Sequence, residues 1–194
     1  MPVHTHWIVF GGSPSSGKTT TLRQLIKLGH KVIPDTARAF VEFELSKGKS
    51  LQEIRGNPKE FQPQVAEFFM ERERNLSPHE HLFLDYGLPD ALSFSTHLEL
   101  DIEHIIQACQ ENRYQQVFLF DRLPLERDNV RTEDERELTE LDLLIDRTYR
   151  EMGYEPIRVP PHAIDERVSF ILAHLTAEET EESSVLQALA TQNA

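Results

Sequence analysis

The stretch Gly12-Ser13-Pro14-Ser15-Ser16-Gly17-Lys18-Thr19 decides the fold of this chain. It fits the pattern G-x-x-x-x-G-K-[ST] at every position. Glycines at both ends let the backbone turn tightly and bring N–H groups against an anion, and a following helix adds its positive N-terminal dipole. The pattern therefore predicts a loop that binds the phosphates of a nucleotide. The residues expected to contact the nucleotide are Gly12, Ser13, Pro14, Ser15, Ser16, Gly17, Lys18, Thr19 and Thr20.

Lys18 and Thr19 would complete the chemistry of this loop. The lysine supplies a mobile positive charge for the β- and γ-phosphates and is a predicted catalytic residue. The threonine supplies a hydroxyl ligand for Mg²⁺. An apolar strand pattern at residues 6–10 and a helical pattern at residues 19–28 flank the loop, as the motif requires. The expected cofactors are therefore ATP and Mg²⁺.

The rest of the chain alternates between short apolar runs and longer helical patterns. The expected strands cover residues 6–10, 31–33, 81–85, 116–121 and 155–159. The expected helices cover residues 19–28, 37–47, 58–75, 138–152 and 164–175, and residues 88–111 form a helix-rich stretch. This alternation predicts a three-layer α/β fold, in which helices cover both faces of a parallel five-stranded sheet. Ligands of such sheets bind beyond the carboxyl ends of the strands, so the residues that follow each strand are the candidates for a site.

Length and charge limit the classes of function. The chain of 194 residues fits a single domain over residues 1–175, followed by an acidic tail over residues 176–194 that is either disordered or a short helix. The net charge of −13 argues against general nucleic-acid binding, and no apolar stretch is long enough to predict a membrane span. The single cysteine, Cys109, fits a reducing cytoplasm. The sequence leaves a protein partner and the oligomeric state open.

Several conspicuous side chains have an ordinary structural explanation. We expect Cys109 to be a small packing residue. The apolar stripe of the helix at residues 58–75 is expected to pack in the core, with stacking against a ligand as the alternative. Its members are Phe61, Val65, Phe68, Phe69 and Leu76. The nine histidines show no spacing typical of a zinc site, so we expect no transition metal.

Acids end two of the predicted strands. Asp85 follows an apolar run and is the favoured second group for positioning Mg²⁺, after Thr19. Asp121 follows the run at residues 117–120 in the same manner and is the rival.

Asp35 and Arg38 follow the second predicted strand. The carboxylate of Asp35 could accept a proton from a substrate hydroxyl, which would make it catalytic as well as substrate-binding. It could equally be the N-cap of the helix that begins near Ala37, because aspartate is a favoured capping residue. Arg38 lies one turn into that helix and is expected to meet an anion on the substrate.

Three arginines follow the fourth predicted strand: Arg122, Arg127 and Arg131. Such a segment could cover the phosphates and offset charge that develops in a transition state. Salt bridges to nearby acids are the alternative, and they are plentiful: Glu126, Asp128, Glu133 and Asp134. The functional reading is favoured for Arg131, and the two readings stay level for Arg122 and Arg127. The acidic run at residues 133–137 is expected to be the solvated start of a helix.

The order of these segments resembles the predicted-ATPase family related to the nicotinamide riboside kinase domain of bacterial NAD-biosynthesis regulators, a group of AAA-domain ATPases and kinases. The resemblance rests on the phosphate loop, then Pro34-Asp35-Thr36-Ala37-Arg38, Phe83-Leu84-Asp85-Tyr86-Gly87-Leu88-Pro89-Asp90 and Asp128-Asn129-Val130-Arg131-Thr132-Glu133-Asp134. The strand after Tyr154 and the segment Asp165-Glu166-Arg167-Val168 also fit. The similarity extends over residues 6–175.

The resemblance implies a kinase-type sheet of strand order 2-3-1-4-5 and phosphorylation of a small hydroxyl-bearing metabolite, or at least ATP hydrolysis. It assigns substrate contacts to Asp35 and Arg38 and magnesium to Asp85. It assigns the cover of the phosphates to a lid that contains Arg127, Asp128 and Arg131. The chain departs from the family where Ser13 and Ser15 replace frequent glycines and Tyr86 replaces an arginine.

Two classes of function follow from the sequence. The first is a magnesium-dependent kinase that acts on a small acceptor such as a nucleoside. The alternative is an ATPase switch that signals to a protein partner, with the segment at residues 121–134 as its moving part. A GTPase is disfavoured because no Asn-Lys-x-Asp segment is present to read guanine.

Overall fold

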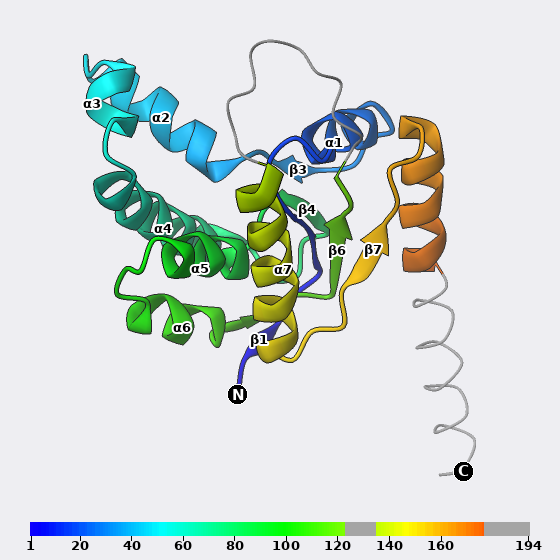
Figure 1. The fold of residues 1–194 in the computed structure, drawn as a ribbon. Coiled ribbons are helices and arrows are strands. Elements are labelled where there is room, and N and C mark those ends of the chain that lie inside the picture. Colours follow the sequence, from blue (N-terminus) through cyan, green and yellow to red (C-terminus); the bar gives the residue numbers. More distant parts are fainter. Residues whose placement is uncertain (123–134, 177–194) are drawn as a thin grey trace.

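Five parallel strands form the central sheet of the computed structural model, which describes residues 1–122 and 135–176 (Figure 1). The sheet runs in the order β3-β4-β2-β6-β7. The five predicted strands correspond, in chain order, to β2, β3, β4, β6 and β7, so the predicted order 2-3-1-4-5 is confirmed. The strands are β2 (Trp7–Gly11), β3 (Val32–Ile33), β4 (Leu82–Asp85), β6 (Gln116–Phe120) and β7 (Ile157–Val159). Every pairing in the sheet is parallel, so all carboxyl ends lie at one edge.

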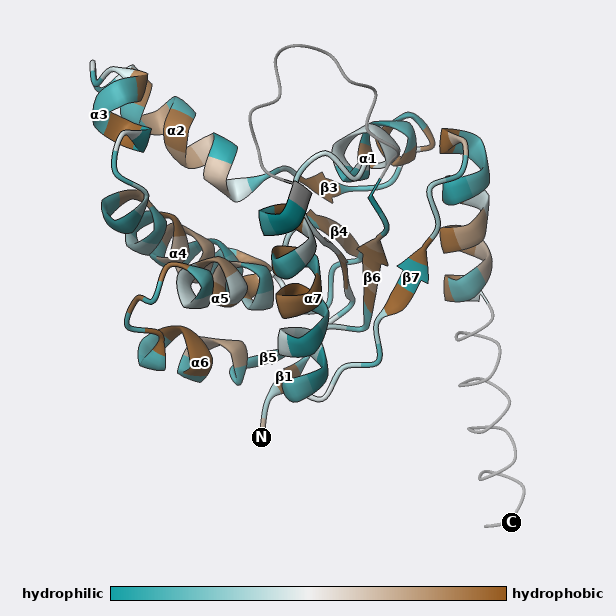
Figure 2. Ribbon diagram, in the orientation of Figure 1, coloured by the Kyte–Doolittle hydropathy of each residue, from teal (hydrophilic) through white to brown (hydrophobic). Residues whose placement is uncertain are grey.

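The strand β2 lies at the centre, between β4 and β6. All five of its residues are buried, as are all four residues of β4. Continuous apolar runs of this kind are typical of strands that are covered on both faces. Figure 2 shows the resulting brown core of β4 and β6 inside helices of mixed polarity.

Helices cover both faces of the sheet, as predicted (Figure 1). They are α1 (Lys18–Lys27), α2 (Thr36–Ser46), α3 (Leu51–Arg55), α4 (Pro58–Asn75), α5 (Leu88–His97), α6 (Glu103–Cys109), α7 (Glu135–Glu151) and a closing helix at residues 164–176. One face packs against α1 and the closing helix through Leu25 and Ile171. The opposite face packs against α7 through Ile145 and Tyr149.

A further apolar core lies away from the sheet and joins α2, α4, α5 and α6. It contains Val65 and Phe69, with Phe61 and Phe68 packed against it. The expectation of core packing is confirmed for these four members of the stripe, whereas Leu76 packs against the core beneath α7.

Two local features were missed by the sequence patterns. The helix-rich stretch at residues 88–111 divides into α5 and α6, and Glu99 between them has a left-handed backbone with a φ of 57°. The short strands β1 (Val3–His4) and β5 (Asn112–Arg113) pair in parallel as a separate small sheet. Two residues are too few to show an alternating pattern, so no periodicity could reveal these strands.

The structure does not describe two segments for which the sequence analysis made predictions. The acidic tail from residue 177 onward lies outside the described residues, as do residues 123–134. Among the described helices, none combines the length and the apolar character needed to cross a bilayer.

A matched pair of substitutions on α7 tests the core under the sheet. Ile145 is fully buried, whereas Leu143 is 68% exposed. We expect Ile145→Ala to lower the free energy of unfolding by about 2–5 kcal/mol, because it removes buried methyl groups and leaves a cavity. Leu143→Ala should change it by no more than about 0.5 kcal/mol. Urea denaturation of both variants measures the difference, and equal losses would contradict this orientation of α7.

Candidate active site

The phosphate loop connects the end of β2 to the start of α1. Gly12 and Gly17 adopt left-handed backbone conformations, with φ of 119° and 89°, and Ser15 does so at 65° despite its side chain. Gly17 is the N-cap of α1, and no side chain caps this helix end. The first N–H groups of a helix lack internal partners, and together with the helix dipole they form a binding site for an anion.

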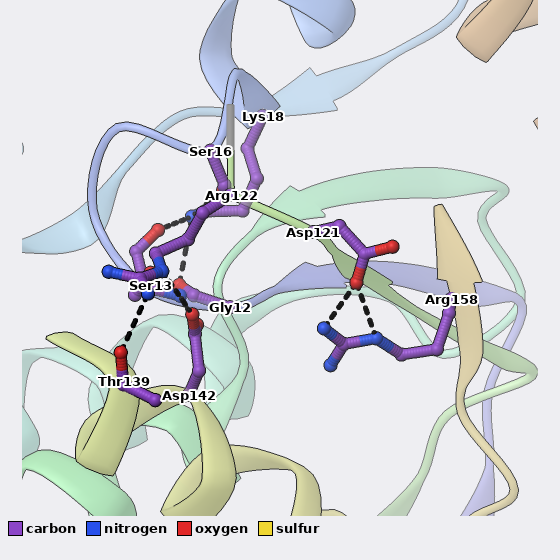
Figure 3. Close-up of polar contacts among 9 residues, drawn as sticks. All are labelled: Gly12, Ser13, Ser16, Lys18, Asp121, Arg122, Thr139, Asp142 and Arg158. Carbon is purple, nitrogen blue, oxygen red and sulfur yellow. Dashed lines mark hydrogen bonds and ion pairs between the residues drawn. The ribbon is translucent and has the colours of Figure 1, made fainter. Parts of the chain in front are cut away.

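Lys18 is buried within the loop, with 4% of its surface exposed. Its Nζ donates hydrogen bonds to the carbonyl oxygens of Gly12 (2.8 Å) and Ser13 (2.7 Å) and to Oγ of Ser16 (3.0 Å), as Figure 3 shows. The ammonium group also lies 4.4 Å from the centre of the Tyr86 ring. Burial lowers the pKa of Lys18 to about 8. The nearby carboxylates of Asp85, Asp90, Asp142 and Asp35 oppose this shift. Tyr86 thus presents an aromatic face to the lysine, at the position where the family resemblance led us to expect an arginine.

Thr19 and Asp85 lie together at the carboxyl edge of the sheet. Oγ1 of Thr19 donates a hydrogen bond of 3.0 Å to Oδ2 of Asp85. The other carboxylate oxygen, Oδ1, is buried without a hydrogen-bond partner among the described residues. Burial raises the pKa of Asp85 to about 6. A hydroxyl and a carboxylate at this spacing are oxygen donors of the kind that Mg²⁺ prefers, so the residues present fit that ion.

The rival acid at the end of β6 has a different environment. Asp121 accepts a hydrogen bond of 2.8 Å from Nε of Arg158, on the neighbouring strand β7 (Figure 3). The geometry therefore brings Asp85, and not Asp121, to the hydroxyl of Thr19.

Two carboxylates that the sequence analysis did not single out hold the first amides of the loop. Asp90, in the first turn of α5, is fully buried, and its Oδ1 accepts from the N–H of Gly12 at 3.2 Å. Its Oδ2 accepts from the N–H of Gly87 at 2.9 Å and from the hydroxyl of Tyr149 on α7. Burial raises the pKa of Asp90 to about 6.

Asp142 on α7 is the second of these carboxylates. Its Oδ1 accepts a hydrogen bond of 2.9 Å from the N–H of Ser13. Its Oδ2 lies 3.1 Å from Nε of Arg122, whose Nη2 donates to Oγ1 of Thr139 at 2.7 Å (Figure 3). The sequence contained a signal for Asp142. Its spacing from the apolar positions 138, 145 and 149 places this acid on the apolar face of the helix.

Arg122 is the one arginine of the predicted cluster whose contacts can be described. Its described contacts are with Asp142 and Thr139 on α7. Arg127, Asp128 and Arg131 lie outside the described residues, and so do Glu126, Glu133 and Asp134. The lid and the catalytic role of Arg131 therefore stay predictions.

Asp35 is the N-cap of α2, where its Oδ1 accepts from the N–H groups of Ala37 (2.9 Å) and Arg38 (3.3 Å). Asp35 therefore caps α2, and the cap uses only one of its two carboxylate oxygens. The next residue, Thr36, accepts a hydrogen bond from Arg72 of α4 through its hydroxyl. Arg72 also donates to the carbonyl oxygen of Tyr86 at 3.0 Å, so one guanidinium joins the segments that follow β3 and β4.

A cavity of about 570 Å³ adjoins the phosphate loop at Pro14. Four aromatic side chains from three segments line it: Phe61, Phe69, Tyr86 and Phe94. Its polar lining consists of Asp35, Arg38, Arg55, Gln62, Asp90, His97 and Glu137. The volume is that of a small-molecule site, and both apolar and polar side chains line it. Part of the phenylalanine stripe therefore packs in the core and faces this cavity at the same time.

Among the described residues, the cysteine and the histidines form no second candidate site. Cys109 is buried, and burial raises the pKa of its thiol well above the ordinary value, as expected of a packing residue. The rings of His6 and His81 lie 4.7 Å apart, but the described part of the chain holds no cluster of three or more groups that could bind a metal.

Tyr149→Phe tests the carboxylate at Gly12. We expect it to lower the free energy of unfolding by about 1–3 kcal/mol at pH 8, because a buried carboxylate loses a donor. With a pKa of about 6, Asp90 is ionised in the folded protein at pH 8 and largely protonated at pH 5. The loss should therefore be smaller at pH 5, since a neutral carboxyl depends less on a donor. Urea denaturation at both pH values measures this, with the same substitution in an Asp90→Asn background as control. A pH-dependent effect that persisted in that background would contradict the assignment.

Comparison with solved structures shows the same fold. A deoxyadenosine kinase from M. mycoides is 14% identical, with a TM-score of 0.63 over 88% of this chain and 99% of that chain. A thymidylate kinase from Ehrlichia chaffeensis is 14% identical, with a TM-score of 0.61 over 90% of this chain and 100% of that chain. A NadR protein in complex with NR is 18% identical, with a TM-score of 0.58, and this chain matches 43% of its length and is itself covered over 80%.

No curated protein matches the sequence. The family comparison, in contrast, covers most of the chain, because residues 7–167 match a family described as an AAA domain. This range begins with β2 and ends in the first turn of the closing helix, so it includes the phosphate loop and every described strand of the central sheet. The resemblance of the motifs is thereby confirmed, and the chain belongs to this AAA-domain family.

Proposed function

We propose that this chain is an ATP-dependent kinase that phosphorylates a hydroxyl group of a small metabolite such as a nucleoside. The observation that carries the proposal is the cavity of about 570 Å³ beside the phosphate loop. A nucleotide switch needs the loop, whereas a second small-molecule cavity at its side is what a phosphotransferase needs to align an acceptor. The kinases that share the fold are consistent with this proposal.

The loop would hold the triphosphate through its backbone amides and Lys18. Lys18 already lies among the loop oxygens, so a small rotation of its flexible stem would bring the charge to the β- and γ-phosphates. Thr19 and Asp85 would hold Mg²⁺, which supplies charge neutralisation at the transferring group when bound. A local cluster of this kind is required because the chain as a whole is strongly acidic.

The acceptor would lie in the cavity with a planar ring among the aromatic side chains. Ring stacking on Phe61 or Phe69 and a few polar contacts would orient it, and Arg38 would contact its polar groups. Asp35 would accept the proton of the reacting hydroxyl through Oδ2, the oxygen that the helix cap does not use. Capping and catalysis are therefore compatible in one side chain.

A screen for the acceptor tests the proposal directly. Purified protein is incubated with Mg²⁺, labelled ATP and a panel of nucleosides, nucleoside monophosphates and vitamin precursors, and transfer of label to each compound is measured. Acceptor-dependent transfer supports a kinase. Tight ATP binding with slow hydrolysis that no acceptor changes would instead favour the ATPase switch.

Asp85→Asn tests the magnesium position. We expect this change to weaken binding of ATP in the presence of Mg²⁺ by about 10- to 100-fold, because a charged contact is lost. Binding of ATP in EDTA should change little. Asp121→Asn is the matched control at the end of β6, on the other side of β2, and calorimetry should find it close to the unmodified protein. Equal effects of the two substitutions would contradict the assignment.

Asp35→Asn separates the two roles of Asp35. Asparagine caps a helix as well as aspartate does, so the melting temperature should be preserved. A group that takes up a proton in the transition state contributes about 10²–10⁴-fold, so kcat with the identified acceptor should fall by at least about 100-fold. Asp35→Ala should lose activity and also about 1 kcal/mol of stability. If Asp35→Asn turned over at the wild-type rate, Asp35 would have no role as a base and would serve only as the helix cap.

A further inference from the structure

Arg167 is a buried cation behind the phosphate loop. It lies in the first turn of the closing helix at residues 164–176, and only 4% of its surface is exposed. Its Nη1 lies 3.2 Å from the carbonyl oxygen of Gly17 and 3.4 Å from that of Ser16. The sequence analysis named it within the segment Asp165-Glu166-Arg167-Val168 but gave it no role.

Nothing in the described part of the chain balances this charge. No carboxylate in residues 1–122 or 135–176 forms an ion pair with Arg167, and its Nε is buried without a hydrogen-bond partner. Burial accordingly lowers its pKa. The first turn of a helix is also the positive end of the helix dipole, which disfavours a cation. A charge buried without a partner is costly, so packing alone does not account for it.

The guanidinium of Arg167 occupies the space that a side chain at Gly17 would enter. A Cβ atom at position 17 would lie 2.2 Å from Nη1 of Arg167, and the φ of 89° already excludes most side chains. The glycine of the motif therefore serves the approach of Arg167 as well as the turn itself.

The contacts of Arg167 with two carbonyl groups are related to the direction of the N–H groups that follow them. In a planar trans peptide the C=O of one residue and the N–H of the next point in opposite directions. Arg167 donates to the carbonyl oxygens of Ser16 and Gly17 from its side of the loop, and the Gly17 carbonyl also accepts from the N–H and the hydroxyl of Thr21 in α1. The N–H groups of Gly17 and Lys18 are thereby directed to the other side of the loop, where an anion would be bound. A donor at the carbonyl also polarises the peptide and strengthens its N–H as a donor.

We propose that Arg167 is a positioning residue for a bound polyphosphate. It fixes the peptide groups at residues 16–18 from behind the loop, and the negative charge of an anion bound on the other side of the loop offsets the cost of its buried charge. The inference rests on the proposed binding of ATP at the loop. It adds a second element, the closing helix, to the site, because the nucleotide and Arg167 stabilise each other through the loop backbone.

Binding measurements on Arg167 variants test this inference. Arg167→Met keeps the apolar stem and removes the charge, and it should raise the Kd for ATP with Mg²⁺ and for inorganic tripolyphosphate at least tenfold. Arg167→Lys keeps the charge without the forked donors, and its Kd should fall between the two. Arg147→Met is the matched control, since Arg147 is an exposed arginine paired with Glu151 on α7, and its Kd should stay at the wild-type value.

Thermal melting separates positioning from simple support of the fold. In Arg167→Met the rise in Tm on addition of ATP with Mg²⁺ should be much smaller than in the wild type. A lower Tm without nucleotide, combined with an unchanged rise and an unchanged Kd, would mean that Arg167 only supports the fold and would overturn the inference.

Hydrogen exchange of the unmodified protein tests the coupling without any variant. Nucleotide should slow exchange of the backbone amides in residues 168–176 as well as in the loop. Protection confined to the loop would overturn the inference even if Arg167→Met fails to fold. A wild-type protein that binds neither ATP nor tripolyphosphate would overturn the proposed function itself, whereas wild-type binding with no effect of Arg167→Met overturns only the role of Arg167.

Discussion

Two carboxylates on the backbone of the phosphate loop, one fully buried and one partly buried, are the interaction on which the site depends. Asp90 and Asp142 accept from the N–H groups of Gly12 and Ser13, the first residues after the central strand. Carboxylates are costly to bury, and the hydroxyl of Tyr149 and the guanidinium of Arg122 offset part of that cost. Because these acids come from α5 and α7, the packing of both helices on the sheet also sets the direction in which the loop leaves it.

The same dependence explains the glycine at the end of β2. A Cβ at Gly11 would lie 2.7 Å from Cδ2 of Leu119 and 3.0 Å from Oδ1 of Asp90. A side chain there would displace the side chain of Leu119 on β6 or the carboxylate that holds Gly12. The acceptor side of the site is fixed in a comparable way, because Arg72 bonds to both Thr36 and Tyr86 and so sets the distance between Asp35 and the aspartate that ends β4.

The sequence predicted the sheet order, the helices on both faces and the meeting of Thr19 with Asp85. The sheet order followed from the family resemblance, whereas the other two features follow from local patterns: short apolar runs, helical spacing and a loop motif of fixed geometry. It also left Asp35 open between cap and base, and the structure shows the cap while leaving one oxygen for chemistry.

The contacts that organise the loop could not be read in the same way, because they join residues far apart in the chain. Asp142 lies 129 positions from Ser13, and Arg167 lies 150 positions from Gly17. An acid or an arginine in a helix is ordinary by itself, and only the packing of α7 and the closing helix gives these two a partner. Tyr86 was noted as a departure from the family, but its contact with Lys18 required the positive φ of 67° that turns its ring toward the loop.

The two carboxylate contacts mean that the phosphate loop is not a portable module. Transplanting residues 12–20 into another strand-to-helix connection would carry over the glycines, the lysine and the threonine, but neither acid that holds the entry of the loop. The sequence motif would then be complete, but its first peptide groups would lack the acceptors that fix their orientation. A graft of this site into a new scaffold has to include the facing turns of α5 and α7.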